Sequence, residues 1–157
     1  MPNHYSVRAG VQLDAAATSF VAKVTDAFFA ATAKDITVTS AYRGPQEQAE
    51  AMYVKMGGSE WNIYADKTAL TEIRGVYLAG KAAKDDRATI VAAMTAVIER
   101  QTGQGTYISN HLRATALDFR TRDLTTDEIA ALRKASTDSG ATVVIDEGSP
   151  PHLHVQF

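Results

Sequence analysis

Cysteine is absent from this chain of 157 residues. Its absence excludes disulfide bonds, thiolate zinc sites and cysteine nucleophiles, so any bound metal needs histidine and carboxylate ligands. No apolar run approaches the roughly 18 residues of a membrane span, and the N-terminal stretch lacks the basic and apolar regions of an export signal. We therefore expect a soluble protein that carries no export signal and has no membrane partner.

A strong excess of charge is also missing, since the formal net charge is −2 and basic residues are scattered among acidic ones. Nucleic acids and anionic membrane surfaces attract proteins whose positive charge is clustered. We therefore expect no nucleic-acid partner. The length suits one domain with its own core, so residues 1–157 are expected to form a single domain.

Apolar residues recur at spacings of three and four in the first third of the chain. They predict an amphipathic helix over residues 11–33, with Asp14 as a candidate cap. A second helix is expected to begin near Pro45, which suits a first helical turn, and to end at the glycine pair 57–58.

The middle of the chain, residues 59–100, has a mostly helical pattern. Two or three helices are expected there, with breaks at Gly75 and Gly80 and an aspartate cap before the last. Thr125 and Glu128 form a capping-box pattern, which predicts a further helix that stops near Gly140.

Strand patterns are short and concentrated in the C-terminal half. They are "DITVTSAY", "ATALDF", "ATVVID" and "HLHVQF", and "EGSPP" is expected to be the loop between the last two. Helices followed by a small, mostly antiparallel sheet predict the α+β class rather than a doubly wound sheet.

Three of the four histidines lie in two short segments. His111 and Asp118 stand seven positions apart, and "HLHVQF" holds the other two. Side chains of a strand alternate between its faces, so His152 and His154 should share a polar face while Leu153 packs on the core. Asp118 should likewise face a polar pocket, which His111 would reach from the preceding loop.

Two histidines and one aspartate are the donors that zinc accepts in an open catalytic site. Such an ion lowers the pKa of bound water and polarises a carbonyl. Hydrolysis also needs a general base and a group that stabilises the oxyanion. Glu147 can supply the first and Arg43, at the end of an expected strand, can supply the second.

Three segments carry a resemblance to a known family. "TSAYRGPQEQ" is similar to the pattern S-G-Y-R-x4-Q with Ala41 in place of glycine, and "SNHLRATALDF" is similar to S-x-H-x-x-G-x-A-x-D. "EGSPPHLHVQF" is similar to a closing segment in which an acidic residue precedes the last zinc histidine. In this order they resemble the zinc D-alanyl-D-alanine carboxypeptidase family. That family includes L-alanyl-D-glutamate endopeptidases of phage lysis and shares its fold with the hedgehog signalling domain.

The resemblance implies a role for each matching residue. His111, Asp118 and His154 would be the zinc ligands. Glu147 would be the base that takes a proton from the attacking water. Arg43 would hold the substrate carbonyl or carboxylate by charge-assisted hydrogen bonds.

Three more residues match positions around the substrate. Ser109 and Gln48 correspond to residues that line the cleft or support the arginine. His152 corresponds to the first histidine of the H-x-H of related zinc peptidases, beside the metal, and it is expected to contact substrate or orient a neighbour.

The chain departs from the family pattern at two points. Ala114 stands where the motif has glycine, so a left-handed backbone there would be strained. Many members place glutamate three residues before the ligand histidine, where this chain has Pro151. Glu147 and Asp146 are therefore both candidates for the base.

The resemblance implies a zinc metallopeptidase that hydrolyses amide bonds in peptidoglycan stem peptides, either an endopeptidase of the endolysin type or a D,D-carboxypeptidase. We expect a monomer that is made in the cytoplasm and reaches the cell wall after release or injection. The alternative is a zinc-stabilised binding module of the hedgehog type without turnover.

Overall fold

The computed structural model describes residues 2–148 and 150–157. Within them the chain has the predicted α+β class, with five α-helices and one five-stranded sheet. Two compact units can be distinguished, one formed by Met1–Tyr42 with Ala114–Phe157 and the other by Arg43–Arg113. No helix in the described part of the chain has the length and apolar composition to cross a membrane.

The first unit contains the sheet, whose strand order is β1-β2-β3-β5-β4. β1 pairs with β2 in parallel, and the other neighbours pair antiparallel, so the sheet is mostly antiparallel as predicted. The strands are β1 (Tyr5–Val7), β2 (Ile36–Ser40), β3 (Ala116–Arg120), β4 (Val143–Gly148) and β5 (Pro151–Gln156).

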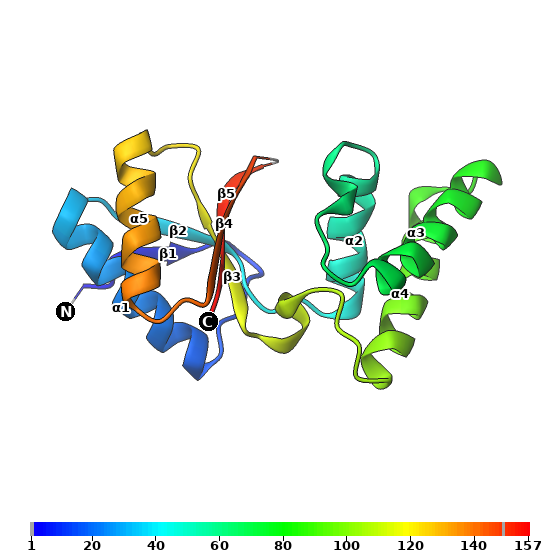
Figure 1. The fold of residues 1–157 in the computed structure, drawn as a ribbon, viewed down its shortest axis with the longest axis horizontal. Coiled ribbons are helices and arrows are strands. Elements are labelled where there is room, and N and C mark those ends of the chain that lie inside the picture. Colours follow the sequence, from blue (N-terminus) through cyan, green and yellow to red (C-terminus); the bar gives the residue numbers. More distant parts are fainter. Residues whose placement is uncertain (1, 149) are drawn as a thin grey trace. The chain divides into compact units, whose positions relative to one another are not determined.

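Helices α1 (Ala15–Thr32) and α5 (Thr126–Asp138) lie together on one side of this sheet (Figure 1). Both begin at the predicted caps. The Asp14 carboxylate accepts a hydrogen bond of 2.7 Å from the Ala17 backbone N–H, and Thr125 with Glu128 forms the capping box in both directions. These bonds satisfy backbone donors that a helix N-terminus leaves unpaired.

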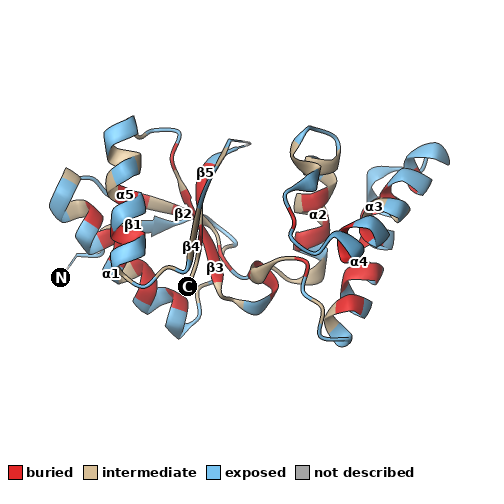
Figure 2. Ribbon diagram, viewed as in Figure 1, coloured by how far each residue is buried: buried red, intermediate tan, exposed pale blue. Residues whose placement is uncertain are grey.

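The helix-covered face of the sheet is apolar. Leu117, Phe119, Leu153 and Val155 are each 0% exposed and belong to one core cluster with residues of α1, including Phe28. Buried positions run along β3 and β5 (Figure 2), and in β3 they are consecutive, because Asp118 is buried as well as its apolar neighbours Leu117 and Phe119. Successive side chains of a strand point to opposite faces, so only the apolar ones contact the helices. Polar residues between these positions are therefore directed to the opposite face.

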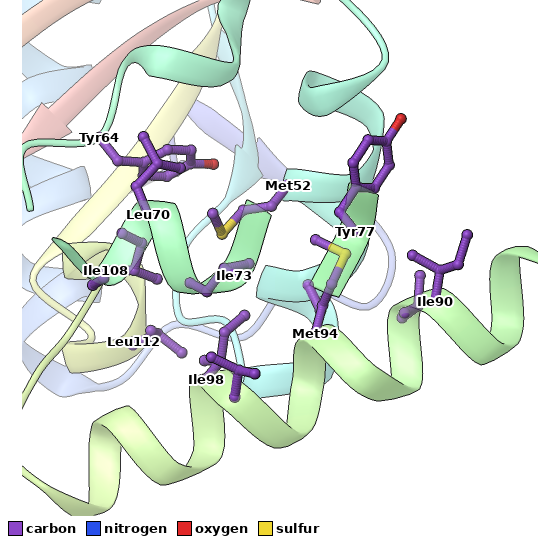
Figure 3. Packing of buried hydrophobic residues seen from close by; sticks show 14 residues of the cluster. Met52, Tyr64, Leu70, Ile73, Tyr77, Ile90, Met94, Ile98, Ile108 and Leu112 are labelled. Carbon is purple, nitrogen blue, oxygen red and sulfur yellow. The ribbon is translucent and has the colours of Figure 1, made fainter. Parts of the chain in front are cut away.

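The second unit is helical. It consists of α2 (Pro45–Met56), η1 (Glu60–Asn62), α3 (Lys67–Ala82), α4 (Arg87–Gly103) and η2 (Asn110–Arg113), where η denotes a short 3-10 helix. Side chains of the three α-helices point toward one another and form its core (Figure 3). The predicted stripe of α4 is buried in this core: Ile90, Val91, Met94, Val97 and Ile98.

Two local expectations are wrong. Gly75 and Gly80 do not break α3, which continues through both, and an ideal Cβ on Gly80 would lie 2.6 Å from Cγ1 of Ile90. Gly80 is thus a point of close helix packing. Glu147 and Gly148 were expected in a loop, but both belong to β4 and pair with His152 and Pro151 of β5.

Candidate metal centre

Strand register gathers four of the predicted site residues on the face of the sheet opposite α1 and α5. Asp118 of β3 is paired with His154 of β5, and Glu147 of β4 is paired with His152 of β5. Because side chains alternate along a strand, His152 and His154 share one face, as predicted. Two neighbouring ladders therefore place two imidazoles and two carboxylates together.

Asp118 and His154 form the first pair. Oδ1 of Asp118 lies 3.0 Å from Nδ1 of His154, and Nε2 of His154 lies 3.1 Å from the amide nitrogen of Gln156. The Gln156 N–H donates to Nε2, so Nδ1 carries the proton that is donated to Asp118. The aspartate is buried and the histidine side chain is 13% exposed.

Glu147 and His152 form the second pair. Oε2 of Glu147 lies 2.6 Å from Nε2 of His152, while Nδ1 of the same ring faces the carbonyl oxygen of Pro150. Oδ1 of Asp118 is 3.8 Å from Nε2 of His152. Both ring nitrogens therefore face acceptors, which favours the doubly protonated imidazolium.

Electrostatics agrees with this reading of the His152 ring. Burial opposes the charged ring, but it is outweighed by the Glu147 hydrogen bond, the Asp118 charge, the Pro150 carbonyl and the Glu147 charge. Together these raise the pKa of His152 above its ordinary value. In the absence of metal, the protonated His152 ring forms an ion pair with the Glu147 carboxylate.

This polar face has the composition of a metal centre. Asp118, Glu147 and His152 form a group whose ligand atoms all lie within 4.8 Å of one another, so it could hold a metal ion. Imidazole nitrogen and carboxylate oxygen suit zinc and other divalent transition metals.

Asp146 is directed away from this face. It is exposed and is paired with Leu153, whose side chain belongs to the core beneath the helices. Of the two acids that the sequence left as candidates for the base, Glu147 is the one that contacts a histidine.

The other predicted residues lie in the second unit. His111 is a buried residue of η2, and its backbone carbonyl accepts a 3.0 Å hydrogen bond from the Arg43 N–H. The Ser109 hydroxyl oxygen accepts one of 3.3 Å from the His111 N–H. Within this unit the structure therefore ties the expected arginine and serine to the segment that carries His111.

Gln48 is fully buried in α2, at 0% exposure. Neither its amide nitrogen nor its amide oxygen has a hydrogen-bond partner in the described part of the chain. An unsatisfied buried amide costs about 1–3 kcal/mol, so this residue is not an ordinary core residue.

Ala114 has a backbone φ of 57°, in the left-handed region. The family pattern has glycine here, and the alanine adopts the conformation that makes glycine favourable. It separates η2 from β3, between His111 and Asp118.

Gln156 is a contact of the site to which the sequence gave no role. The period of two placed it on the polar face with both histidines, and this was the only available signal. The structure adds the hydrogen bond from its amide to His154. Without metal this contact fixes the tautomer of His154, and an ion bound through Nε2 would replace it.

Comparison with known proteins identifies no relative: no family model, no curated protein and no solved structure matches this chain. The functional argument therefore rests on the site itself.

Proposed function

We propose that the protein is a zinc-dependent peptidase that hydrolyses amide bonds in peptidoglycan stem peptides. One observation carries the proposal: Asp118, Glu147, His152 and His154 are gathered on one polar face of the sheet, with contacts of 2.6 and 3.0 Å between carboxylate and imidazole. Open catalytic zinc sites combine a few such ligands with a nearby acid–base group.

The ligands that we assign to the ion are His111, Asp118 and His154. The assignment follows the motif resemblance, and the three residues would supply two imidazole nitrogens and one carboxylate oxygen. This donor set fits zinc with one position left for water or substrate. When bound, zinc supplies Lewis acidity toward a carbonyl and lowers the pKa of water.

The remaining side chains supply the proton transfers. Glu147 accepts a proton from the attacking water and passes it to the leaving amine, and its contact with His152 holds its carboxylate in place. The His152 ring, held on its other side by the Pro150 carbonyl, presents positive charge toward the developing oxyanion.

Arg43 is assigned to the substrate. Its backbone is joined to the His111 segment by a hydrogen bond, and its guanidinium would bind the substrate carbonyl or carboxylate. Ser109 and Gln48 are assigned to the lining of the cleft. For Gln48 the support is its buried amide without a partner in the described part of the chain, which a substrate amide could satisfy.

The substrate class rests on the motif resemblance. An endopeptidase of the endolysin type and a D,D-carboxypeptidase share this chemistry and differ in the bond that they cut. We further propose a phage-type or injected enzyme, which would act on the wall after release or injection.

Digestion of purified peptidoglycan tests the proposal. The zinc-loaded protein is incubated with peptidoglycan beside a chelated sample, and the fragments are identified by mass spectrometry. We expect zinc-dependent release of one defined product, which Glu147→Gln abolishes and Asp146→Asn leaves unchanged. Tightly bound zinc without any product, from walls of several cross-link types, would contradict the peptidase and favour the zinc-stabilised binding module.

A further inference from the structure

The group formed by Asp118, Glu147 and His152 is distinct from the ligand set assigned above, although it shares Asp118 with it. Its members come from three adjacent strands, β3, β4 and β5, so backbone pairing fixes their spacing. All three side chains are largely shielded from solvent, with exposed fractions of 5% for Asp118, 15% for Glu147 and 9% for His152.

Three potential ligand atoms of this group lie close together, and Nε2 of His152 becomes available when an ion displaces the proton that it donates to Glu147. Nε2 of His152 lies 2.6 Å from Oε2 of Glu147 and 3.8 Å from Oδ1 of Asp118. In a tetrahedral zinc site, bonds of about 2.0–2.1 Å place neighbouring ligand atoms roughly 3.3 Å apart. The two measured separations lie on either side of this value, so a small movement of one side chain would accommodate an ion.

The orientation of the His152 ring suits a ligand. Its Nδ1–H donates to the Pro150 carbonyl, which directs Nε2 toward the two carboxylates. Metal-binding histidines ordinarily donate their other ring N–H to a carbonyl or carboxylate in this way. The hydrogen bond that holds a metal ligand is therefore already formed in this structure.

We infer that Asp118, Glu147 and His152 form a second, weaker binding site for a divalent transition metal, with Asp118 shared between the two ions. The second ion binds more weakly because it must approach a first divalent ion, and the shared carboxylate offsets part of their repulsion. Paired metal sites with ions about 3.5–4 Å apart commonly use such a shared ligand.

Occupation of the second site has a consequence for turnover. An ion bound by Glu147 and His152 withdraws the base and the positive ring from the reaction, so excess metal acts as an inhibitor. This consequence rests on the proposed function, whereas the binding itself does not.

Equilibrium dialysis against zinc, with bound metal measured by mass spectrometry, tests the inference. For the wild-type chain we expect bound zinc to rise from about one to about two ions per chain as free zinc increases. Glu147→Gln and His152→Phe should each hold the number near one. Asp146→Asn alters the neighbouring acid on the other face, and His4→Ala removes a separate histidine–carboxylate pair, with Asp35 at 3.2 Å. Neither of these two controls should change the second step.

Three results would overturn the inference. Binding that stops at one ion per chain at every zinc concentration would mean that only a proton occupies the group. A second step that persists in the folded double variant Glu147→Gln/His152→Phe would place the ion elsewhere. If His4→Ala also lost the second binding step, the second ion would be assigned to His4 and Asp35 at the surface. Circular dichroism of each variant checks that it is folded, and the wild-type count is independent of any variant.

The same titration separates this inference from the proposed function. Two bound ions without hydrolysis would leave the second site in place and refute the peptidase. Hydrolysis with only one bound ion at every zinc concentration would refute the second site and leave the peptidase in place. If both hold, hydrolysis should be highest near one ion per chain and should fall to about a tenth or less when the second site fills.

Discussion

Ala114 has a left-handed backbone conformation, which is unusual for a residue with a side chain. Its φ of 57° brings Cβ close to the following carbonyl, at a cost of about 1–2 kcal/mol that glycine avoids. We expect Ala114→Gly to raise the free energy of unfolding by about 1 kcal/mol, less the extra chain entropy of glycine when unfolded. Urea denaturation of the metal-free protein measures this change.

Ala83 provides a matched control for that substitution. It follows α3 with a φ of −75°, in the right-handed region, so Ala83→Gly gains no relief of strain. It should leave the protein equally stable or less stable. A loss of stability in Ala114→Gly similar to that in Ala83→Gly would show that the left-handed conformation at 114 is not a source of strain.

His152 predicts a dependence of stability on pH in the metal-free protein. Its pKa is raised above 6.5, despite burial, mainly through the Glu147 hydrogen bond. A raised pKa stabilises the folded state below the ordinary value, and this contribution disappears as pH rises through the folded value. The wild-type advantage over Glu147→Gln in free energy of unfolding should therefore be larger near pH 6 than near pH 9, at about constant ionic strength.

Histidine resonances followed by NMR against pH provide the direct measurement. Glu147→Gln should lower the pKa of His152, and Asp146→Asn, on the other face of β4, should not. An identical His152 titration in wild type and Glu147→Gln would contradict the assigned contact.

For individual residues, the sequence predicted which face of a strand each side chain occupies but not which residue it contacts. Alternation placed His152 and His154 together because a strand has a period of two. The choice between Glu147 and Asp146 could not be made in advance, because it depends on where β4 begins and on its register with β5. The contact from Gln156 to His154 had the same dependence.

Helix α3 contains two glycines with opposite surroundings, which predicts opposite effects of the same substitution. An ideal Cβ on Gly75 meets nothing within 4 Å, whereas one on Gly80 meets Ile90 of α4 at 2.6 Å. Gly75→Ala should stabilise the protein by about 0.5–1 kcal/mol through helix propensity. Gly80→Ala should destabilise it by about 1–3 kcal/mol, because the two helices must move apart.

Thermal unfolding of both variants tests this pair. A gain in both would show that α3 and α4 separate easily at Gly80, and a loss in both would show that Gly75 has a packing role. Because both variants replace glycine by alanine in the same helix, the difference between them reports the surroundings and not the substitution itself.

The elements were predicted best where a local interaction sets them. Asp14, Pro45 and the Thr125–Glu128 box each mark a helix start through bonds or dihedral angles within a few residues. The strand β1 was missed because its pairing with β2 spans about thirty residues, from Tyr5 to Ile36, and its three residues, Tyr5–Val7, are too few to show a period of two. The glycine breaks were wrong because the packing of α3 outweighs a propensity cost of about 1 kcal/mol per glycine.

For the whole molecule, metal binding and folding should be linked. A ligand that binds only the folded chain stabilises it, and free zinc at about 1,000 times the dissociation constant adds about 4 kcal/mol to the free energy of unfolding. The melting temperature should therefore rise with zinc and fall on chelation. His154→Ala should lose most of this shift, while His4→Ala should keep it. An equal shift in His154→Ala and wild type would contradict the assignment of His154 as a ligand.

The fold class followed from composition and pattern, since helices with few, short strands predict α+β. The three motifs also identified residues that are hydrogen-bonded within each unit. Asp118 contacts His154 in the first unit, and Arg43 contacts His111 in the second. Neither the sequence pattern nor the fold identifies the substrate or the scissile bond, because hydrolysis of different amide bonds uses the same ligands and the same base.

Diffraction from crystals grown with one equivalent of zinc, recorded at the zinc absorption edge, tests the central claim most directly. The account predicts one strong anomalous peak, about 2.0–2.2 Å from a ring nitrogen of His111, a ring nitrogen of His154 and a carboxylate oxygen of Asp118. A peak bonded to none of these residues, or no peak in protein that binds zinc in solution, would contradict the assignment.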